Sequence, residues 1–359
     1  MDGAAIRPNT LEQQREELYR RLEQQNIEPL WRMLAAATPK EPVVNSVPHI
    51  WRWRDVQPAL DVAGNVVSPK EAERRVLMLI NPAYESRTLR TVGLLYAGYQ
   101  MVRPGESADS HRHAPNAQRF IVKGSGVYMN VDGETAMAAK GDFVVTPSWC
   151  WHDHGNNSNE DMVWLDGLDL AFTNILDANF FEDWAGPGDA PPVTVAEGDS
   201  HRRWGRHMRP SWQPTNRPNR TSMLLYPWHE ARDALHGLRY DEGSPYDGII
   251  MQYCDPRDGG PTMPTFASSL QLLRKDEHTK AHRHTSSTIY HVAEGGGRSI
   301  IGGQEFLWEE GDTFVLPSWT WHEHESVGGD AVLFSYTDRP IVDQFHWYRE
   351  EAHPSGYQN

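Results

Sequence analysis

A repeated set of three histidines is the part of this sequence best suited to binding a catalytic metal. The two sets lie 170 to 171 residues apart and comprise His111, His113 and His152, then His282, His284 and His322. In both copies the third histidine ends the same segment, Gly-Asp-x4-Pro-Ser-Trp-x-Trp-His. The repetition indicates two modules of one fold, each presenting three imidazoles.

The spacing of the first set suits a metal site built on strands. Side chains two residues apart on a strand point to the same face, so His111 and His113 can both face inward. His152 follows His113 by 39 residues, which leaves room for the three or four strands that return the chain to the pocket. Three neutral imidazoles would hold one face of a divalent ion and leave other positions open. The alternative is a set of ordinary hydrogen-bonded histidines, which the recurrence disfavours.

Length and composition fit a folded enzyme. The chain has 359 residues, of which 38% are hydrophobic and 23% charged, so neither disorder nor a membrane protein is indicated. The net charge of −15 argues against nucleic-acid binding. Cys150 and Cys254 do not form a disulfide framework, and the first residues lack a secretory pattern, so we expect a cytoplasmic protein.

A helical segment is expected to precede a β-rich remainder. Thr10-x-x-Gln13 resembles a capping box and predicts a helix over residues 10–36 that Pro29 interrupts. Proline and tryptophan between residues 38 and 69 predict an irregular arm. After residue 91, short apolar runs separated by turns predict a mainly β sandwich or barrel. Residues 186–220, rich in proline and arginine, predict a linker.

On these residues the chain resembles the cupin superfamily. The matching positions of the two cupin motifs are Gly105, His111, His113, Gly141, Pro147, His152 and Asn156. Two positions depart from the pattern: Ala117 or Gln118 stands where the motif has glutamate, and Trp149 replaces a glycine. Without a carboxylate ligand, three neutral imidazoles leave a divalent ion at its full charge, which suits an anionic, chelating substrate.

More narrowly, the chain resembles the bicupin gentisate 1,2-dioxygenases and the related salicylate and 1-hydroxy-2-naphthoate dioxygenases. Residues 110–120, 141–154 and 164–169 carry this resemblance, which covers nearly the whole chain. It implies two double-stranded β-helix (jelly-roll) barrels, non-haem Fe(II) and molecular oxygen. It also implies ring opening between the carboxyl- and hydroxyl-bearing carbons to a maleylpyruvate-type product, and a homotetramer.

The expected domain organisation follows from the repeat and the resemblance. We expect a helical arm over residues 1–90, a catalytic barrel over 91–185 and a linker and connecting segment over 186–262. A second barrel over 263–340 and a C-terminal tail over 341–359 complete the chain. The expected partners are a small aromatic acid and oxygen, with neither nucleic acid nor membrane.

Several residues are expected to bind the substrate. Arg119 lies six residues after His113, an even spacing that returns it to the inward face, where it can clamp a carboxylate. A surface ion pair is the alternative role. By resemblance, Arg75 is a second pocket arginine and Gln100 lines the pocket near the ring.

The strand that carries Gln100 bears on the choice of substrate. Tyr96 and Gly98 share the face of Gln100 by two-residue alternation. By resemblance, tyrosine at position 96 favours gentisate, because the salicylate-cleaving relatives carry tryptophan there. Gly98 is also compatible with salicylate cleavage, so 5-substituted salicylates and 1-hydroxy-2-naphthoate remain alternatives.

His154 and Asp166 are the candidate catalytic residues. By resemblance they meet a ring hydroxyl or the reacting oxygen. His154 follows His152 by two residues and can face the same way, as a hydrogen-bond donor or proton shuttle. The alternative is that both residues only orient the ligands.

The second module repeats the ligands but not the substrate clamp. Gln271 matches Gln100, whereas Tyr290 and Tyr336 stand at the positions expected for Arg119 and Asp166. The second triad is therefore a possible metal site at which catalysis is not expected. Competing functions are a non-catalytic, ligand-binding bicupin, and oxalate decarboxylation or sugar isomerisation. The latter two chemistries usually retain the glutamate that is absent here.

Overall fold

A capping box starts the first helix, as the sequence predicts. In this computed structural model the Thr10 side chain accepts a hydrogen bond from the Gln13 N–H, and the Gln13 side chain accepts one from the Thr10 N–H. The helix ends before Pro29, and a second helix begins directly after it, which confirms the predicted interruption. These helices belong to a separate compact unit, residues 1–43, and are α1 (Leu11–Gln24) and α2 (Leu30–Ala37).

The structure describes residues 10–72, 74–84, 88–205, 211–212 and 223–358. The start of the expected arm, residues 1–9, and two pieces of the expected linker, residues 206–210 and 213–220, lie outside these ranges. Among the described helices, none is long and apolar enough to cross a membrane.

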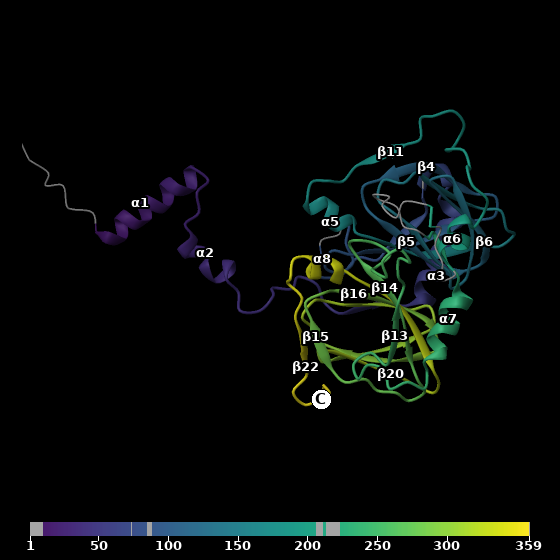
Figure 1. Cartoon of the computed structure of the whole chain (residues 1–359). Coiled ribbons are helices and arrows are strands. Elements are labelled where there is room, and N and C mark those ends of the chain that lie inside the picture. The colour runs from purple at the N-terminus through teal and green to yellow at the C-terminus, as the bar shows by residue number, and fades with distance from the viewer. Residues whose placement is uncertain (1–9, 73, 85–87, 206–210, 213–222, 359) are drawn as a thin grey trace, which may run out of the picture. The chain divides into compact units, whose positions relative to one another are not determined.

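Two β-barrels of the same topology make up the second unit, residues 44–359 (Figure 1). In the described part of the chain, each barrel pairs a six-stranded sheet with a five-stranded one. The larger sheet of the first barrel has the order β12 (Leu225–Tyr226), β8 (Phe143–Thr146), β5 (Ala117–Lys123), β10 (Met162–Leu168), β3 (Tyr96–Val102) and β2 (Val76–Met78). Its smaller sheet has the order β11 (Phe181–Asp183), β4 (Ser107–His113), β9 (His152–Asn156), β6 (Ser125–Val131) and β7 (Glu134–Ala139).

The second barrel repeats this arrangement. Its larger sheet has the order β1 (His49–Trp51), β19 (Thr313–Leu316), β16 (Thr288–Glu294), β21 (Ala331–Thr337), β14 (Ala267–Leu273) and β13 (Ile249–Gln252). Its smaller sheet has the order β18 (Gln304–Glu309), β17 (Gly296–Ile301), β20 (His322–Ser326), β15 (His282–His284) and β22 (Glu350–Ala352). The remaining helices are α3 (Trp53–Val66), α4 (Pro69–Ala72), α5 (Leu170–Ile175), α6 (Asp199–Trp204), α7 (Trp228–Gly237) and α8 (Arg339–Gln344).

Strands β3 to β11 correspond in order to β14 to β22, so the expected pair of jelly-roll barrels is present. Alternation of side chains explains why these segments form barrel walls. In β6, for example, Val127, Met129 and Val131 are buried, while the residues between them are partly exposed. One continuous core joins the barrels, in which Phe120 of the first stacks on Phe334 of the second at 4.3 Å.

Each barrel also receives an edge strand and a helix end from a segment that precedes the other barrel. Strand β1, upstream of the first barrel, pairs with β19 of the second, and β12, upstream of the second, pairs with β8 of the first. The Trp53 N–H at the start of α3 donates to Asp312 at 2.8 Å, and the Trp228 N–H at the start of α7 donates to Asp142 at 2.8 Å. The halves of the repeat therefore exchange these segments.

The repeated Gly-Asp pairs, Gly141-Asp142 and Gly311-Asp312, form the contacts that hold the exchanged segments. A Cβ on Gly141 would lie 2.4 Å from the Trp228 ring, and one on Gly311 would lie 2.6 Å from Trp53. Glycine makes room for the tryptophan, and the aspartate beside it caps the helix that the tryptophan begins.

Two sequence expectations change as a result. The irregular arm predicted over residues 38–69 is wrong for the 14 residues of α3, because Leu60 is fully buried and packing overrides the proline and tryptophan content. The predicted domain boundaries place residues 44–90 in a helical arm and residues 223–262 in a linker and connecting segment. The structure instead uses them as equivalent segments of the repeat, and the sequence signal was Trp-x-Trp53 matching Tyr-x-Trp228.

The caps should contribute measurably to stability. Asp142→Ala removes the acceptor of the Trp228 and Ala139 N–H groups and should lower the free energy of unfolding by about 1–3 kcal/mol. Asp233→Ala, on the exposed side of α7, is the control and should change it by less than about 0.5 kcal/mol. Urea unfolding measures the stability of both variants. Equal unfolding midpoints for Asp142→Ala and Asp233→Ala would show that the cap does not stabilise the contact between the barrels.

Candidate metal centre and substrate pocket

Two neighbouring strands of the first barrel bring the first triad together. His111 and His113 lie on β4, and His152 begins β9, where it is the direct cross-strand partner of His111. The His152 ring centroid lies 4.2 Å from that of His111 and 4.8 Å from that of His113. One atom from each residue can therefore meet at a common ion.

Backbone carbonyls orient all three rings. The acceptors of the Nδ1 groups are Asp109 O for His111 at 2.8 Å, Pro115 O for His113 at 2.8 Å and Cys150 O for His152 at 2.9 Å. A carbonyl can only accept, so each Nδ1 must carry the proton, and each Nε2 keeps its lone pair. The Nε2 of His152 is buried and has no hydrogen-bond partner among the described residues, as a metal ligand would before its ion binds.

Burial keeps these ligands neutral. It lowers the pKa of His111 to about 3 and that of His113 to about 4, and it lowers the pKa of His152 well below its ordinary value. Neutral imidazoles are the form that binds metal, and borderline divalent ions such as Fe²⁺ accept nitrogen donors of this kind. The donor set therefore fits the expected iron.

A buried ion pair lies on the neighbouring sheet. Arg119 on β5 and Asp166 on β10 are direct cross-strand partners, and Arg119 Nε lies 3.3 Å from Asp166 Oδ1. Arg119 also donates to Thr146 at 2.8 Å, and Trp164 Nε1 donates to Asp166 at 3.0 Å. Burial raises the pKa of Asp166 to about 6, although the charge of Arg119 opposes that shift. The surface ion pair considered for Arg119 is excluded, because both side chains are buried.

His154 belongs to a polar contact beside the triad. Its Nε2 accepts from the Gln100 amide nitrogen at 2.7 Å, and its ring meets Trp164 edge-on at 5.0 Å. Since Nε2 accepts, Nδ1 carries the proton, and this buried donor has no partner among the described residues. His154 therefore offers one hydrogen bond that the described residues do not satisfy.

Tyr96 and Gly98 form one feature of the pocket wall. A Cβ on Gly98 would lie 2.7 Å from the Tyr96 hydroxyl, so glycine is what lets the phenol occupy this place. Gly98 is also the cross-strand partner of Asp166. From the second barrel, Tyr336 donates to the Tyr96 carbonyl at 2.8 Å and holds this strand in place.

The structure replaces Arg75 with Arg74 as the second arginine near the triad. Arg75 donates to both oxygens of Glu106, at 2.8 and 3.0 Å, and to Val67 O, so its donors are already used. The charge of Arg74 is, after burial, the largest cause of the lowered pKa of His111. The reason is register: Val76 on β2 pairs with Gln100, so alternation places Arg74 on the pocket face and Arg75 on the other.

Phe181 is a site residue that sequence reasoning missed. Its ring stacks on His111 at 5.3 Å, and the Arg74 guanidinium lies over the same ring at 5.1 Å. Strand β11 places it there by pairing Phe181 with His113. No motif marks this residue, because β11 is a three-residue edge strand within the segment after β10.

The second triad is assembled in the same way on β15 and β20, where His282 pairs with His322. One expected equivalence is wrong. Tyr290 does occupy the place of Arg119, but its cross-strand partner is Ser335, so Ser335 and not Tyr336 corresponds to Asp166. The loop before β21 is one residue shorter than the loop before β10, which shifts the offset to 169.

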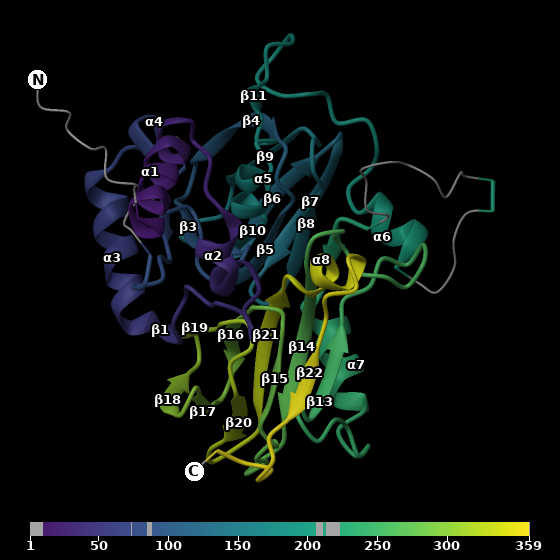
Figure 2. The ribbon, with the colours of Figure 1, turned by 90° about the vertical axis from the view of Figure 1, so that its left-hand side faces the viewer.

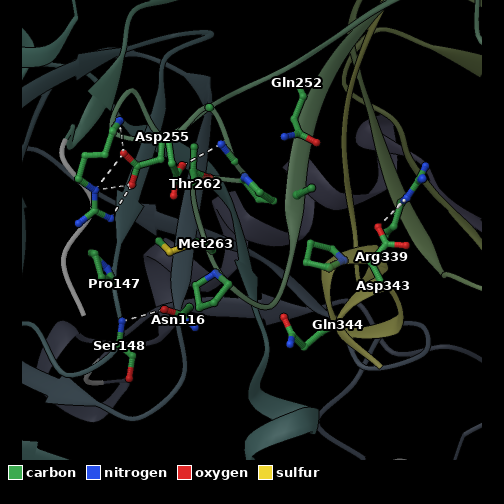
Figure 3. A pocket seen from close by; sticks show the side chains of 18 residues that line it. Asn116, Pro147, Ser148, Gln252, Asp255, Thr262, Met263, Arg339, Asp343 and Gln344 are labelled. Carbon is green, nitrogen blue, oxygen red and sulfur yellow. Dashed lines mark hydrogen bonds and ion pairs between the residues drawn. The ribbon is translucent and has the colours of Figure 1, made fainter. Parts of the chain in front are cut away.

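A large cleft between the barrels is separate from both triads. It has a volume of about 1090 Å³, and Figure 3 shows Asn116 and Ser148 of the first barrel on one side and Arg339 and Asp343 of the second on the other. None of the six triad histidines lines it. Neither candidate metal centre therefore lies in this cleft.

The fold and the first triad define a duplicated jelly-roll protein with a histidine-bound metal centre and a buried arginine beside it. The family model described as cupin domain matches residues 98–168 and 269–336. A gentisate 1,2-dioxygenase of Aquipseudomonas alcaligenes is 41% identical over 338 residues, which cover 94% of this chain and 96% of that protein.

Two further similar proteins are also ring-cleaving 1,2-dioxygenases. The 5-aminosalicylate 1,2-dioxygenase of a Comamonas species is 39% identical over 96% of this chain and 92% of that protein. The crystal structure of the salicylate 1,2-dioxygenase of Pseudoaminobacter salicylatoxidans, an adduct with gentisate, superposes with a TM-score of 0.87 at 31% identity, over 98% of this chain and 97% of that one. The chain belongs to the bicupin gentisate 1,2-dioxygenase family of ring-cleaving enzymes.

Proposed function

We propose that the first barrel is an Fe(II)-dependent centre that opens gentisate, or a related salicylate, with O2 between the carboxyl-bearing and hydroxyl-bearing ring carbons. The product would be of the maleylpyruvate type. The observation that carries the proposal is the buried, charged Arg119 on the sheet that faces three neutral imidazoles with uncommitted Nε2 atoms. The similarity to dioxygenases of gentisate, 5-aminosalicylate and salicylate supports the substrate class.

His111, His113 and His152 would hold the iron. When bound, Fe(II) supplies Lewis acidity that favours the phenolate form of the substrate and the redox chemistry that O2 requires. The protein supplies position and charge. Arg119 and Arg74 provide two guanidinium groups for the substrate carboxylate, and Asp166 holds Arg119 in place through their ion pair.

His154 would act on oxygen or on a ring hydroxyl. Its unsatisfied Nδ1–H can donate a hydrogen bond, while the Gln100 amide holds the opposite ring nitrogen. Asp166, with a pKa of about 6, is the other group that can hold or release a proton in this pocket.

The wall formed by Tyr96 and Gly98 would select among substrates. The Tyr96 hydroxyl lies over Gly98 and next to the charge of Asp166, and offers a polar partner to a ring hydroxyl. This favours gentisate. A 5-substituted salicylate is the second candidate, which the Comamonas relative favours, and 1-hydroxy-2-naphthoate is a further alternative.

We also propose a cytoplasmic homotetramer that acts in the breakdown of aromatic compounds. The apolar side chains of α2, Leu30, Trp31 and Leu34, are more than half exposed, which favours contact with another subunit. Neither cysteine forms a disulfide within the described part of the chain, as expected in a reducing compartment.

Turnover tests the substrate class. Purified protein loaded with Fe(II) should consume O2 with gentisate in an oxygen electrode and generate an ultraviolet band from the ring-opened product. Salicylate, 5-aminosalicylate and 1-hydroxy-2-naphthoate complete the panel. His111→Ala should abolish uptake, because it removes a ligand. No uptake by the wild type with any of the four acids would contradict the proposal.

Arg74 and Arg75 make a matched pair of tests. Arg74→Gln should raise KM for the aromatic acid about 10- to 100-fold, because a charge-assisted contact contributes about 1.5–3 kcal/mol. Arg75→Gln should leave KM within about twofold and lower the melting temperature instead, because it leaves the Glu106 carboxylate without its partner. A raised KM in Arg75→Gln and an unchanged KM in Arg74→Gln would indicate that Arg75, and not Arg74, binds the substrate.

Asp166 should govern the acid limb of the pH profile. Burial raises its pKa to about 6, so the carboxylate is ionised above that pH and lost as pH falls through it. In the wild type, kcat/KM should fall below about pH 6, in a range where His111, with a pKa of about 3, is still neutral. Asp166→Asn should lack this limb.

The kinetic split identifies the role of Asp166. A raised KM with unchanged kcat in Asp166→Asn would indicate that Asp166 positions Arg119, whereas a lowered kcat would indicate proton transfer. An unchanged profile in the variant would exclude both roles.

A further inference from the structure

We infer that the second triad is a metal centre of a different kind, with Asp247 as a carboxylate beside the ion and Glu350 as a support for His282. It takes a divalent transition-metal ion and not the aromatic acid. This inference does not rest on the proposed reaction of the first barrel. Backbone carbonyls orient two of its rings as in the first triad. The Nδ1 of His322 donates to Thr320 O at 3.2 Å, and that of His284 lies 3.0 Å from Ser286 O, with the Ser286 hydroxyl as a second partner at 2.8 Å.

Asp247 lies in a turn that holds its carboxylate toward the triad. Its Oδ2 accepts from the Ser244 hydroxyl at 2.9 Å, and its carbonyl accepts from the Gln271 amide at 2.9 Å. The remaining oxygen, Oδ1, lies 3.9 Å from His282 Nε2. Among the described residues, the ligand atoms that lie within 4.8 Å of one another are those of the three histidines alone. Asp247 is therefore placed to act beside the ion, through its charge or through a metal-bound water, and not as a direct ligand.

The two ring nitrogens of His282 have the environment of a metal ligand. Its Nε2 is buried and has no hydrogen-bond partner in the described part of the chain. Its Nδ1 donates to Glu350 Oε1 at 3.1 Å, and the other oxygen of Glu350 accepts from the Tyr348 hydroxyl at 2.8 Å. A carboxylate behind an imidazole fixes its tautomer and makes its free nitrogen a stronger ligand.

Equivalent edge strands of the two barrels bring side chains of different chemistry to the triads. Strand β22 places Glu350 opposite His284 in the second barrel, at the register position where β11 places Phe181 opposite His113 in the first. Figure 2 shows β22 in yellow beside β15. An aromatic ring therefore covers the first triad, and a carboxylate supports the second.

The preceding segment shows the same reversal of charge. Just before β2 the first barrel brings Arg74 toward its triad, and just before β13 the second brings Asp247. Tyr290 stands at the position that Arg119 occupies in the first barrel, so the second barrel lacks this arginine. The first site supplies positive charge for an anionic ligand, whereas the second supplies carboxylates that balance a cation by themselves.

Cobalt(II) is the probe that tests the second site, because its visible spectrum reports the coordination number. The full-length wild type should bind two Co(II) per chain by metal analysis, and His113→Ala should bind one. A His113→Ala/His322→Ala double variant should bind none. If the single variant binds no Co(II) while remaining folded, the second site does not exist.

Asp247→Asn tests the carboxylate beside the ion in the His113→Ala background. It preserves shape and should weaken Co(II) binding at least tenfold and alter the visible spectrum. Asp241→Asn, exposed in the same segment, is the control and should do neither. Equal affinity in these two variants would overturn the role of Asp247.

Glu350 has a neighbouring control of its own. Glu350→Gln should weaken Co(II) binding about tenfold, whereas Glu351→Gln, whose partner is the side chain of Arg283, should not. Added Co(II) should slow amide hydrogen exchange of β22 in His113→Ala. Unchanged Co(II) affinity in Glu350→Gln would contradict the inference. So would an amide exchange rate in β22 that is the same with and without Co(II). None of these experiments measures turnover, so failure of the proposed reaction would leave this inference unaffected.

Discussion

Two carboxylates at equivalent positions, the half-buried Asp142 and the buried Asp312, make the contacts on which the rest of the structure depends. Each caps a helix from a segment that precedes the other barrel, and each sits beside a glycine that leaves room for the first tryptophan of that helix. Neither barrel can complete its larger sheet without the segment upstream of its partner. The two barrels therefore share one core, and that core holds the strands that carry the histidines in register.

On this frame, the position of the metal ligands depends on a simple rule. Each triad imidazole gives its Nδ1 proton to a group that can only accept, so its Nε2 faces the centre. The same orientation is found in both barrels, so both triads bring their ligand atoms together in the same way. What the barrels do not share is the set of side chains that edge strands and connecting segments bring to each triad.

Those edge segments decide the chemistry of each centre. In the first barrel they bring Arg74 and Phe181, and the sheet adds the buried pair of Arg119 and Asp166. Charges held in a buried site are oriented before the ligand arrives, which is the condition for tight recognition of a small anion. In the second barrel they bring Asp247 and Glu350, so the negative charge is built into the protein.

By itself, the sequence determined the features that follow from local periodicity. Alternation on a strand placed His111 and His113 on one face, the capping box located α1, and the repeated motif predicted two barrels. The tertiary structure decided between Arg74 and Arg75, replaced Tyr336 with Ser335 as the counterpart of Asp166, and brought Phe181, Asp247 and Glu350 to the triads. These depend on pairing register, on a loop one residue shorter and on segments distant in sequence. No local pattern encodes such contacts, because only packing of the folded chain creates them.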